Sequence, residues 1–241
     1  MNPIYHDIKS AAKNREKLLA VLSDPDKMEL ENVSGFIKKV NQSIATHIFV
    51  GGSTVEEFKT ERIVVKIKKQ TELPVILFPG DVTQLTEEAD GLLFLSLISG
   101  RNPEYLIGKH VEAVSKLSYA NIEVIPTGYL LIENGKQTSV ELVSQTKPLS
   151  RNNVILIGDT AKAGELLGMK LIYLEAGSGA AHPVDSEIIS KVKNILNIPL
   201  IVGGGIRSKQ ELEKVYKSGA DLVVIGTAFE DNENFFEELK K

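Results

Sequence analysis

The sequence has no cysteine, and it has only four histidines. Without cysteine there can be no disulfide, no thiolate metal ligand and no cysteine nucleophile. The histidines are His6, His47, His110 and His182. Their positions are too scattered to suggest a zinc cluster, so we expect each of them at the surface or in packing.

Long apolar runs and strong charge of one sign are absent as well. No apolar run approaches the roughly 18 residues that a membrane span needs, and the N-terminus lacks the apolar core of a signal peptide. The formal net charge is −4 and no long basic block occurs, which gives no case for nucleic-acid binding. We therefore expect a cytoplasmic protein without a nucleic-acid partner.

The composition is that of an ordinary globular protein. Its 241 residues are 42% hydrophobic and 25% charged, and no proline- or serine-rich linker divides them. This length suits a single α/β barrel. We expect one domain that spans residues 1–241.

The most informative stretch runs from Pro199 to Ala228. It holds two apolar runs, 200–202 and 222–225, separated by a segment with helical spacing that Ser208 is placed to cap. This order predicts a parallel β-α-β unit with both strands buried. Glycine follows each strand, at the edge where parallel sheets bind ligands: Gly203, Gly204, Gly205 and Gly226. Either the glycines form a phosphate site, as after strands seven and eight of a (β/α)8 barrel, or they only make tight turns.

Further apolar runs complete a set of eight strands. We expect them at 19–22, 47–50, 74–78, 91–95, 122–126, 171–175, 200–202 and 222–225. Only about a dozen residues separate the third strand from the fourth, the low end for a crossover helix. The fold class is therefore α/β, a modified TIM (β/α)8 barrel with a shortened or missing third helix.

Several helices and one hairpin are expected between and beside these strands. Helices are predicted at 5–20, 29–42, 55–69, 103–117, 152–167, 185–196 and 232–240. Thr54 and Glu57 have the spacing of a capping box for the helix over 55–69. Residues 129–147 resemble a β-hairpin in the loop after the fifth strand.

Polar residues at the carboxyl ends of barrel strands are the first catalytic candidates. These are Asp24, Ser53, Asp81, Thr127, Glu175 and Thr227. A carboxylate and a hydroxyl from adjacent strands, Asp24 and Ser53, suit Mg²⁺, although Asp24 before a proline equally suits a turn. Glu175 lies between an apolar strand and a glycine-rich loop, where partial burial raises the pKa of a general base; the alternative is an ion pair in the barrel rim.

Five segments together resemble the geranylgeranylglyceryl phosphate synthase family. They are Ser23-Asp24-Pro25-Asp26-Lys27, Val50-Gly51-Gly52-Ser53, Tyr173-Leu174-Glu175-Ala176-Gly177-Ser178-Gly179, Val202-Gly203-Gly204-Gly205-Ile206 and Ile225-Gly226-Thr227-Ala228. The resemblance covers nearly the whole chain in order, and it looks closest to group II, which is related to PcrB-type prenyltransferases. That group has a modified TIM barrel with an irregular third helix.

The resemblance implies a Mg²⁺-dependent prenyltransferase. The C3 hydroxyl of sn-glycerol 1-phosphate would attack C1 of geranylgeranyl diphosphate, forming an ether and releasing pyrophosphate. Asp24 and Ser53 would hold Mg²⁺, Glu175 would act as base, and Tyr173 would assist it. The glycerol phosphate site implied by the resemblance comprises Tyr173, Leu174, Glu175, Ala176, Gly177, Ser178, Gly179, Gly204, Gly205, Gly226 and Thr227.

One position departs from the related bacterial branch, which carries a lysine where this chain has Leu22. Lys27 and Arg207 are the candidates for the missing cation. The prenyl tail needs an apolar channel, and the residues that could contribute to it are Leu93, Phe94, Leu95, Leu97, Ile98, Tyr105 and Tyr129.

Two other readings stay open. The glycine pattern also fits another phosphate-binding TIM-barrel enzyme, such as a phosphosugar isomerase or lyase, and a non-catalytic barrel is the second alternative. By resemblance we further expect a homo-oligomer, a dimer or hexamer, and the tail-bearing substrate suggests transient membrane contact.

Overall fold

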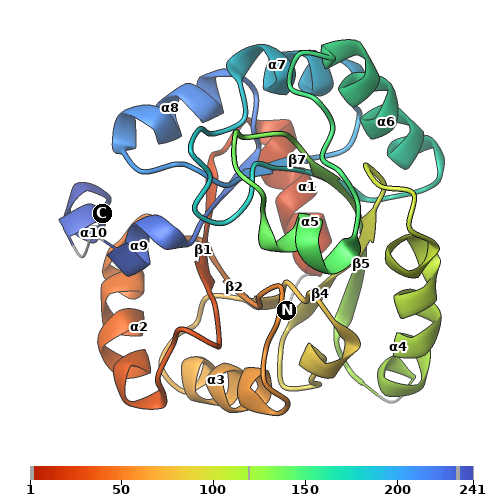
Figure 1. The fold of residues 1–241 in the computed structure, drawn as a ribbon. Helices are drawn as coiled ribbons and strands as arrows, with labels where there is room; N and C mark the ends of the chain where they lie inside the picture. The colour runs from red at the N-terminus through yellow and green to blue at the C-terminus, as the bar shows by residue number, and fades with distance from the viewer. Residues whose placement is uncertain (1–2, 119, 232–233, 241) are drawn as a thin grey trace.

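The computed structural model describes residues 3–118, 120–231 and 234–240. Eight parallel strands form a closed barrel in sequence order, and the view in Figure 1 looks along the barrel. This confirms the predicted fold class. The strands are β1 (Leu18–Ser23), β2 (His47–Val50), β3 (Val75–Leu77), β4 (Gly91–Leu97), β5 (Glu123–Leu131), β6 (Leu171–Glu175), β7 (Leu200–Gly203) and β8 (Leu222–Ile225).

The outer layer consists of helices that follow the strands. The α-helices around the barrel wall are α2 (Val33–Gln42), α3 (Lys59–Lys68), α4 (Lys109–Leu117), α6 (Val154–Leu166), α7 (Ser186–Ile195) and α8 (Lys209–Lys217). Short turns of 3-10 helix, η1 (Leu30–Asn32), and of π-helix, η3 (Glu104–Gly108), precede α2 and α4. The chain ends in α9 (Thr227–Asp231) and α10 (Asn234–Glu238).

Alternation along each strand divides the apolar side chains between two cores. Phe49 and Leu93 belong to the cluster inside the barrel, whereas their neighbours Ile48 and Leu92 belong to the cluster between barrel and helices. Successive side chains of a strand point to opposite faces, and here both faces are covered. This explains why the strands appear in the sequence as unbroken apolar runs.

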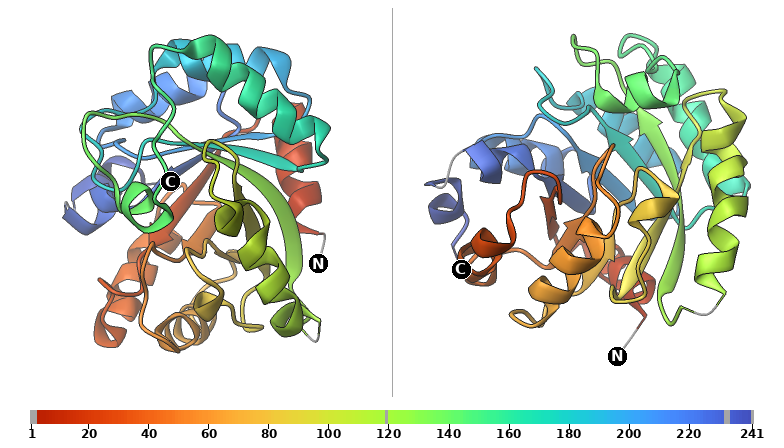
Figure 2. Two further views of the ribbon diagram at one scale, coloured as in Figure 1. Left: turned by 45° about the vertical axis from the view of Figure 1, so that its right-hand side comes forward. Right: turned by 60° about the horizontal axis from the view of Figure 1, so that its bottom comes forward.

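Helix α1 (Ile4–Asn14) closes the end of the barrel at which the strands begin. Its residues Ile4 and Ile8 are buried in the inner core, and the Glu123 carboxylate accepts the backbone N–H groups of Ile4 and Tyr5. Figure 2 shows α1 at the opposite end of the barrel from α5 (Ser139–Ser144). The prediction of a helix over 5–20 is wrong at its end, because Arg15 has a left-handed backbone (φ 60°) and ends α1.

The third outer helix is missing, which agrees with the prediction that it is shortened or missing. Residues 78–90, all of them described, contain only the 3-10 turn η2 (Val82–Gln84) between β3 and β4. The two strands pair at only two positions, Ile76 with Gly91 and Leu77 with Leu92. Strand β4 continues to Leu97 in register with β5. Beyond Leu92, β4 therefore has no strand partner on the β3 side of the closed barrel, and we call this unpaired part of the wall the seam.

The hairpin predicted over 129–147 is wrong. Residues 129–131 are the end of β5, where Tyr129 pairs in parallel with Leu97 of β4 and Tyr173 of β6. The same extension makes Thr127 a buried mid-strand residue rather than a strand-end residue. After the strand comes α5, whose N-terminus is capped by the Thr138 side chain.

The capping box expected at Thr54 and Glu57 is also wrong. Helix α3 begins only at Lys59, after Phe58 in a left-handed conformation (φ 64°). The helix predicted over 152–167 is confirmed as α6, with the Asn153 side chain accepting the Leu156 N–H. The helix predicted over 232–240 is shorter, because α10 begins at Asn234, and its predicted start at 232–233 lies outside the described residues.

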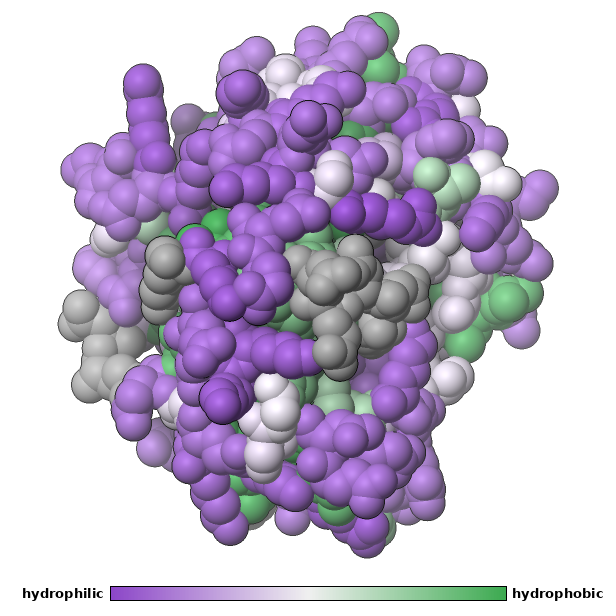
Figure 3. Space-filling view, turned by 90° about the vertical axis from the view of Figure 1, so that its left-hand side faces the viewer, coloured by the Kyte–Doolittle hydropathy of each residue, from purple (hydrophilic) through white to green (hydrophobic). Residues whose placement is uncertain are grey.

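The outer faces of α2 and α8 are polar, in the way that amphipathic helices require. Figure 3 shows a mainly hydrophilic surface on the side where α2 and α8 lie. Within the described ranges, the helices are all too short or too polar to cross a bilayer.

Candidate functional site

A cavity of about 490 Å³ opens at the carboxyl ends of the strands and continues into the seam. Its polar end comprises Glu175 and the loops after β6, β7 and β8, residues 177–179, 204–207 and 226–228. Its apolar arm lies against β4, η2 and α4. A volume of this size suits a small-molecule site.

Glu175 lies at the last position of β6 and is 6% exposed. One carboxylate oxygen, Oε1, accepts the Gly177 N–H at 2.5 Å. Burial raises the pKa of Glu175, while the Gly177 N–H and the Tyr173 hydroxyl act in the opposite direction. The position thus combines a raised pKa with a fixed orientation, which suits a general base.

Three aromatic rings pack together beside this carboxylate. The Tyr173 ring centroid lies 5.3 Å from those of Phe78 and Tyr129. Burial and then the charge of Glu175 raise the pKa of both tyrosines well above the ordinary value. The Tyr173 hydroxyl lies near Glu175 but makes no hydrogen bond of ordinary geometry with a described residue. The Tyr173 O–H group is therefore a buried donor that lines the cavity and has no acceptor of ordinary geometry among the described residues.

Two glycines of the β7 end give Tyr173 and Glu175 their space. A Cβ at Gly203 would overlap the Tyr173 hydroxyl and lie 3.0 Å from Glu175 Oε2. A Cβ at Gly204 would overlap Glu175 Oε1, and its backbone is left-handed (φ 85°). Both positions therefore require glycine, because the two side chains pack directly against the backbone. The hypothesis that these glycines only make tight turns does not explain this close packing.

The loops of the polar end are joined to one another by polar contacts. The hydroxyls of Ser178 and Thr227 lie 3.3 Å apart, which brings the ends of β6 and β8 together. The Arg207 guanidinium donates to the Ala180 carbonyl at 2.8 Å, so the β7 loop is tied to the β6 loop. Hydroxyls, a guanidinium and glycine backbone therefore line one small space, which suits an anion.

Helix α5 and the residues before it form a roof over the cavity. The Asn134 side-chain amide donates to the Ala176 carbonyl at the polar end. On the side of the seam, the Tyr105 hydroxyl donates to the Val143 carbonyl at 3.0 Å. Ser139, Val140 and Val143 line the cavity from above. The roof is thus attached on both sides of the cavity that it covers.

Asp24 and Ser53 line the same cavity, at the ends of β1 and β2. A Cβ at Gly52 would lie 2.7 Å from Asp24 Oδ1, so the carboxylate packs against the end of β2. Asp24 also accepts the Asp26 N–H at 3.0 Å, which makes it a turn residue as well. Within the described ranges, no group of three or more histidine, cysteine, aspartate or glutamate residues could hold a metal.

The apolar arm is lined by side chains from both faces of β4. Leu93 and Leu95 belong to the inside of the barrel, whereas Leu92 and Phe94 belong to the outside. The arm therefore passes through the seam, from the barrel interior toward α4. Of the residues predicted for a channel, Leu93, Phe94, Leu95, Leu97, Tyr105 and Tyr129 line the cavity. Ile98 instead packs in the outer core.

Most of the predicted site residues lie together. The following line the cavity: Asp24, Ser53, Tyr173, Glu175, Gly177, Ser178, Gly179, Gly204, Gly205, Gly226 and Thr227. Leu174 and Ala176 do not, because alternation along β6 buries their side chains in the outer core. Their roles in the reaction, like those of the others, stay predictions.

Sequence reasoning missed the residues that the roof and α4 contribute. Asn134, Val140 and Lys109 belong to segments whose contact with the cavity depends on the fold. Asn102 and Pro103, which precede η3 and α4, mark the start of a helix but do not indicate which of its faces meets the cavity. No local pattern singles these residues out.

The fold and the cavity define the class of protein: a TIM-barrel enzyme whose cavity joins a glycine-walled polar end to an apolar arm. The PcrB family model matches residues 12–241. A geranylgeranylglyceryl phosphate synthase of Zunongwangia profunda is 58% identical over 97% of this chain and 99% of its own. That of Flavobacterium johnsoniae is 54% identical over 98% of both chains.

The solved structures agree with the sequence relatives. The synthase of Thermoplasma acidophilum, in complex with its substrate sn-glycerol-1-phosphate, superimposes with a TM-score of 0.92 at 31% identity, covering 99% of this chain and 96% of its own. The chain belongs to the PcrB family, and it is an enzyme of the geranylgeranylglyceryl phosphate synthase type.

Proposed function

We propose that this protein transfers a geranylgeranyl group from its diphosphate to the C3 hydroxyl of sn-glycerol 1-phosphate. The observation that carries the proposal is the continuous cavity, which joins a polar end that holds a buried carboxylate to an apolar arm. A phosphosugar enzyme needs a polar pocket but has no use for an apolar arm that passes through the barrel wall. The names and the bound substrate of the relatives support the same reaction.

Glu175 is the proposed base. Its Oε1 is engaged by Gly177, which leaves Oε2, beside the Tyr173 hydroxyl, to accept the proton of the glycerol C3 hydroxyl. The freed oxygen forms the new bond to C1 of the prenyl chain, and the bond from C1 to the diphosphate oxygen breaks. Pyrophosphate leaves with that electron pair.

The polar end is the proposed glycerol phosphate site. Ser178 and Thr227 supply hydroxyls, and the glycines at 177, 179, 204 and 205 have left-handed backbones that turn the loops around one space. Successive residues that alternate between right-handed and left-handed or turn conformations direct their backbone N–H groups toward a common centre, which can bind an anion. An anionic phosphate is the part of the substrate that such a centre favours.

The donor set at Asp24 and Ser53 fits Mg²⁺, which we propose as the cofactor. One carboxylate and one hydroxyl from neighbouring strand ends are hard oxygen donors, and Mg²⁺ binds few protein oxygens while it keeps waters and substrate phosphates. When bound, the ion stabilises negative charge on the leaving pyrophosphate.

We also propose that the protein is a homo-oligomer. Exposed apolar side chains occur on α4 and at the two ends of α6: Val111, Val114, Ile155, Leu166 and Leu167. Exposed apolar side chains of this kind are typical of surfaces through which proteins associate. Light scattering that gives 26.4 kDa, the mass of one chain, at working concentration would contradict this proposal.

The reaction is tested by incubating the protein with sn-glycerol 1-phosphate and geranylgeranyl diphosphate, followed by mass detection of the ether. The sn-3 enantiomer and a sample without Mg²⁺ serve as controls. Ether from the sn-1 isomer that depends on Mg²⁺ is the expected result. No ether with either enantiomer, together with turnover of a phosphosugar, would overturn the proposal.

The metal site is tested separately with Asp24→Asn. Removal of the carboxylate's charge is expected to raise the Mg²⁺ concentration needed for half-maximal activity. An unchanged requirement would remove Asp24 from the metal site and leave the transfer reaction itself untouched.

A further inference from the structure

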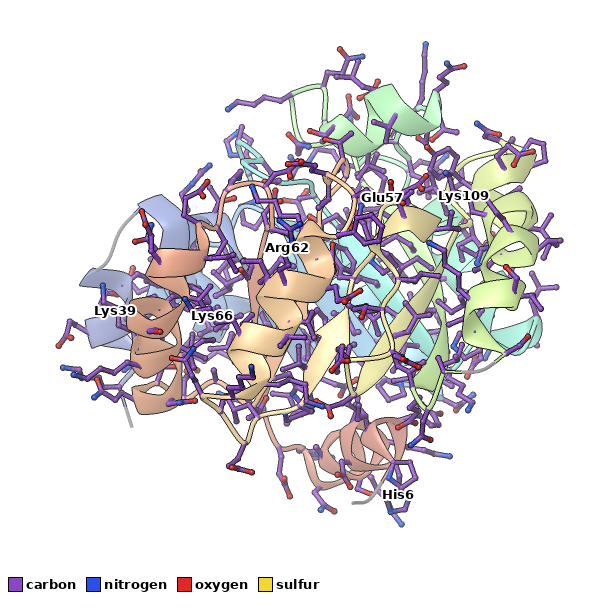
Figure 4. The ribbon with its side chains drawn as sticks, turned by 90° about the horizontal axis from the view of Figure 1, so that it is seen from below. His6, Lys39, Glu57, Arg62, Lys66 and Lys109 are labelled. Atoms are coloured by element: carbon purple, nitrogen blue, oxygen red, sulfur yellow. The ribbon has the colours of Figure 1, made fainter. Side chains whose placement is uncertain are left out.

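An ion pair between Asp81 and Lys109 lies where the apolar arm begins. Asp81 follows β3, and Lys109 is the first residue of α4. Their side chains pair directly, and both line the cavity. Figure 4 shows Lys109 at the end of α4 that lies on the same side of the barrel as α5.

The pair is held close to the ends of β1 and β2. A Cβ at Gly80 would lie 2.5 Å from the Gly52 carbonyl oxygen and 2.8 Å from that of Ser53. Gly80 thus packs on the segment that carries the proposed metal ligand, and Asp81 is the next residue. The Asp81–Lys109 pair therefore lies between the strand ends proposed to hold Mg²⁺ and the apolar arm proposed to hold the tail.

The other two cations of the cavity have different surroundings. Arg207 is bound to the Ala180 carbonyl, which places it at the glycerol phosphate end. Lys27 belongs to the turn after Asp24, where its backbone N–H donates to the Asp24 carbonyl. Lys109 reaches the cavity from the opposite wall, beyond the ends of β1 and β2. A prenyl diphosphate whose tail enters the seam has its diphosphate between these walls.

We propose that Lys109 binds the diphosphate of the prenyl substrate, and that Asp81 holds its ammonium group in place until the substrate arrives; this rests on the proposed function. Lys109 supplies the cation for which the sequence offered only Lys27 and Arg207. It compensates for the apolar Leu22 from a different element of the fold.

The geometry allows this exchange of partners. Asp81 is fixed to its own turn, because its Oδ1 accepts the Thr83 N–H at 3.1 Å and the Thr83 hydroxyl at 3.2 Å. The Lys109 ammonium group is at the end of a long side chain, where it pairs with Asp81 and lies 5.3 Å from the centre of the Tyr105 ring. The two side chains are 37% and 25% exposed, so water and anions reach the pair and their mutual attraction is screened. A diphosphate carries more negative charge than Asp81 and competes for the same ammonium group.

Lys109→Gln tests the proposal, with Lys116→Gln as the matched control. Lys116 lies on the same helix, and its side chain donates to the Val82 carbonyl of η2. Its substitution therefore shows the effect of losing a lysine that contacts η2 rather than Asp81. Lys109→Gln is expected to raise KM for geranylgeranyl diphosphate roughly 10- to 100-fold, the range of a lost charge-assisted hydrogen bond. KM for sn-glycerol 1-phosphate is expected to stay within about twofold, well below the effect of one lost hydrogen bond.

Inhibition by inorganic pyrophosphate gives a readout without the tail. It is expected to weaken in Lys109→Gln by a similar factor, to stay at the wild-type value in Lys116→Gln and to recover in Lys109→Arg. An equal rise in KM for both substrates would overturn the role of Lys109. Kinetics of Lys109→Gln equal to those of Lys116→Gln would overturn it as well. A wild-type protein that forms no ether at all would instead overturn the proposed function, so the two failures are distinguishable.

Discussion

At the polar end of the cavity the walls are largely glycine backbone, whereas at the apolar arm they are side chains. The polar end is built on β6, β7 and β8, which pair continuously, and Glu175 there lies in register with Gly203. The apolar arm lies where β3 and β4 pair at only two positions and an outer helix is missing. One end is therefore formed by a complete part of the barrel and the other by an incomplete part.

This difference has consequences for each kind of residue. At the complete end, strand pairing fixes Glu175 and Tyr173 so closely that a single added Cβ collides with them. At the seam the outer helix that would follow β3 is missing. The side chains of Leu92 and Phe94 line the cavity there. We therefore expect substitutions at the polar end to lower turnover strongly. Substitutions along the arm should have smaller effects that depend on the length of the substrate's tail.

The largest effect is expected from Glu175→Gln, which keeps the shape of the polar end but removes its base. Turnover should fall roughly 10²- to 10⁴-fold, the contribution of a general base, while KM for sn-glycerol 1-phosphate changes little. Steady-state kinetics on both substrates measure this. A loss of tenfold or less would mean that the proton goes elsewhere.

The pH dependence of the wild type belongs to the same residue. Burial raises the pKa of Glu175, and only the carboxylate form can accept a proton. Activity should therefore fall as the pH drops through a value above that of an ordinary glutamate, and the residual activity of Glu175→Gln should lack this step. The same acid limb in both proteins would assign it to another group.

The second effect in size is expected from Gly203→Ala, which tests the rigidity of the polar end. The new Cβ would overlap the Tyr173 hydroxyl and displace it from Glu175. We expect a loss of turnover of about 100-fold, because small misplacements of reacting groups have effects of this order. Kinetics together with circular dichroism separate this loss from unfolding.

Gly35→Ala on α2 is the matched control for that substitution. A Cβ at Gly35 meets nothing within 4 Å, so activity should be unchanged, and the helix should gain about 1 kcal/mol at most. If Gly203→Ala behaved like Gly35→Ala, the close packing at the β7 end would carry no function.

Ala113→Phe tests the graded response of the apolar arm. Ala113 is buried on α4 and lines the arm, so a larger side chain shortens the space there. We expect kcat/KM to fall about 10-fold for geranylgeranyl diphosphate, by loss of apolar burial, and much less for a ten-carbon diphosphate. A substrate series by mass spectrometry measures this, and equal losses for both tails would place the tail elsewhere.

The smallest effects are expected from the two attachments of the roof. Asn134→Ala removes the bond to Ala176 at the polar end, and Tyr105→Phe removes the bond to Val143 at the seam. Each loses one hydrogen bond, so we expect KM changes of roughly fivefold. Asn134→Ala should affect sn-glycerol 1-phosphate, and Tyr105→Phe should affect the prenyl diphosphate. The same change in both variants for both substrates would make the roof one rigid unit.

Two predicted elements show where a local pattern fails. Residues 129–147 have the local pattern of a hairpin, but parallel pairing of Tyr129 with both Leu97 and Tyr173 extends β5 instead. In this case strand pairing overrides a local preference. Thr54 and Glu57 have the spacing of a capping box, yet α3 begins only after Phe58, which has a left-handed backbone.

The sequence by itself determined the eight strands, their order and a third helix that is shortened or missing. Strands buried on both faces appear as apolar runs, glycine follows where several of them end, and the distance between the third and fourth runs is at the low end for a crossover helix. The residues near strand ends, among them Asp24, Ser53 and Glu175, were therefore found from position along the chain alone.

Only the tertiary structure decided what lies between these residues. The seam exists because β4 extends to Leu97, beyond its last pair with β3 at Leu92. The roof and Lys109 reach the cavity from segments that are distant in sequence. Such contacts depend on barrel closure and on which helix face turns inward. A local pattern of residues contains neither.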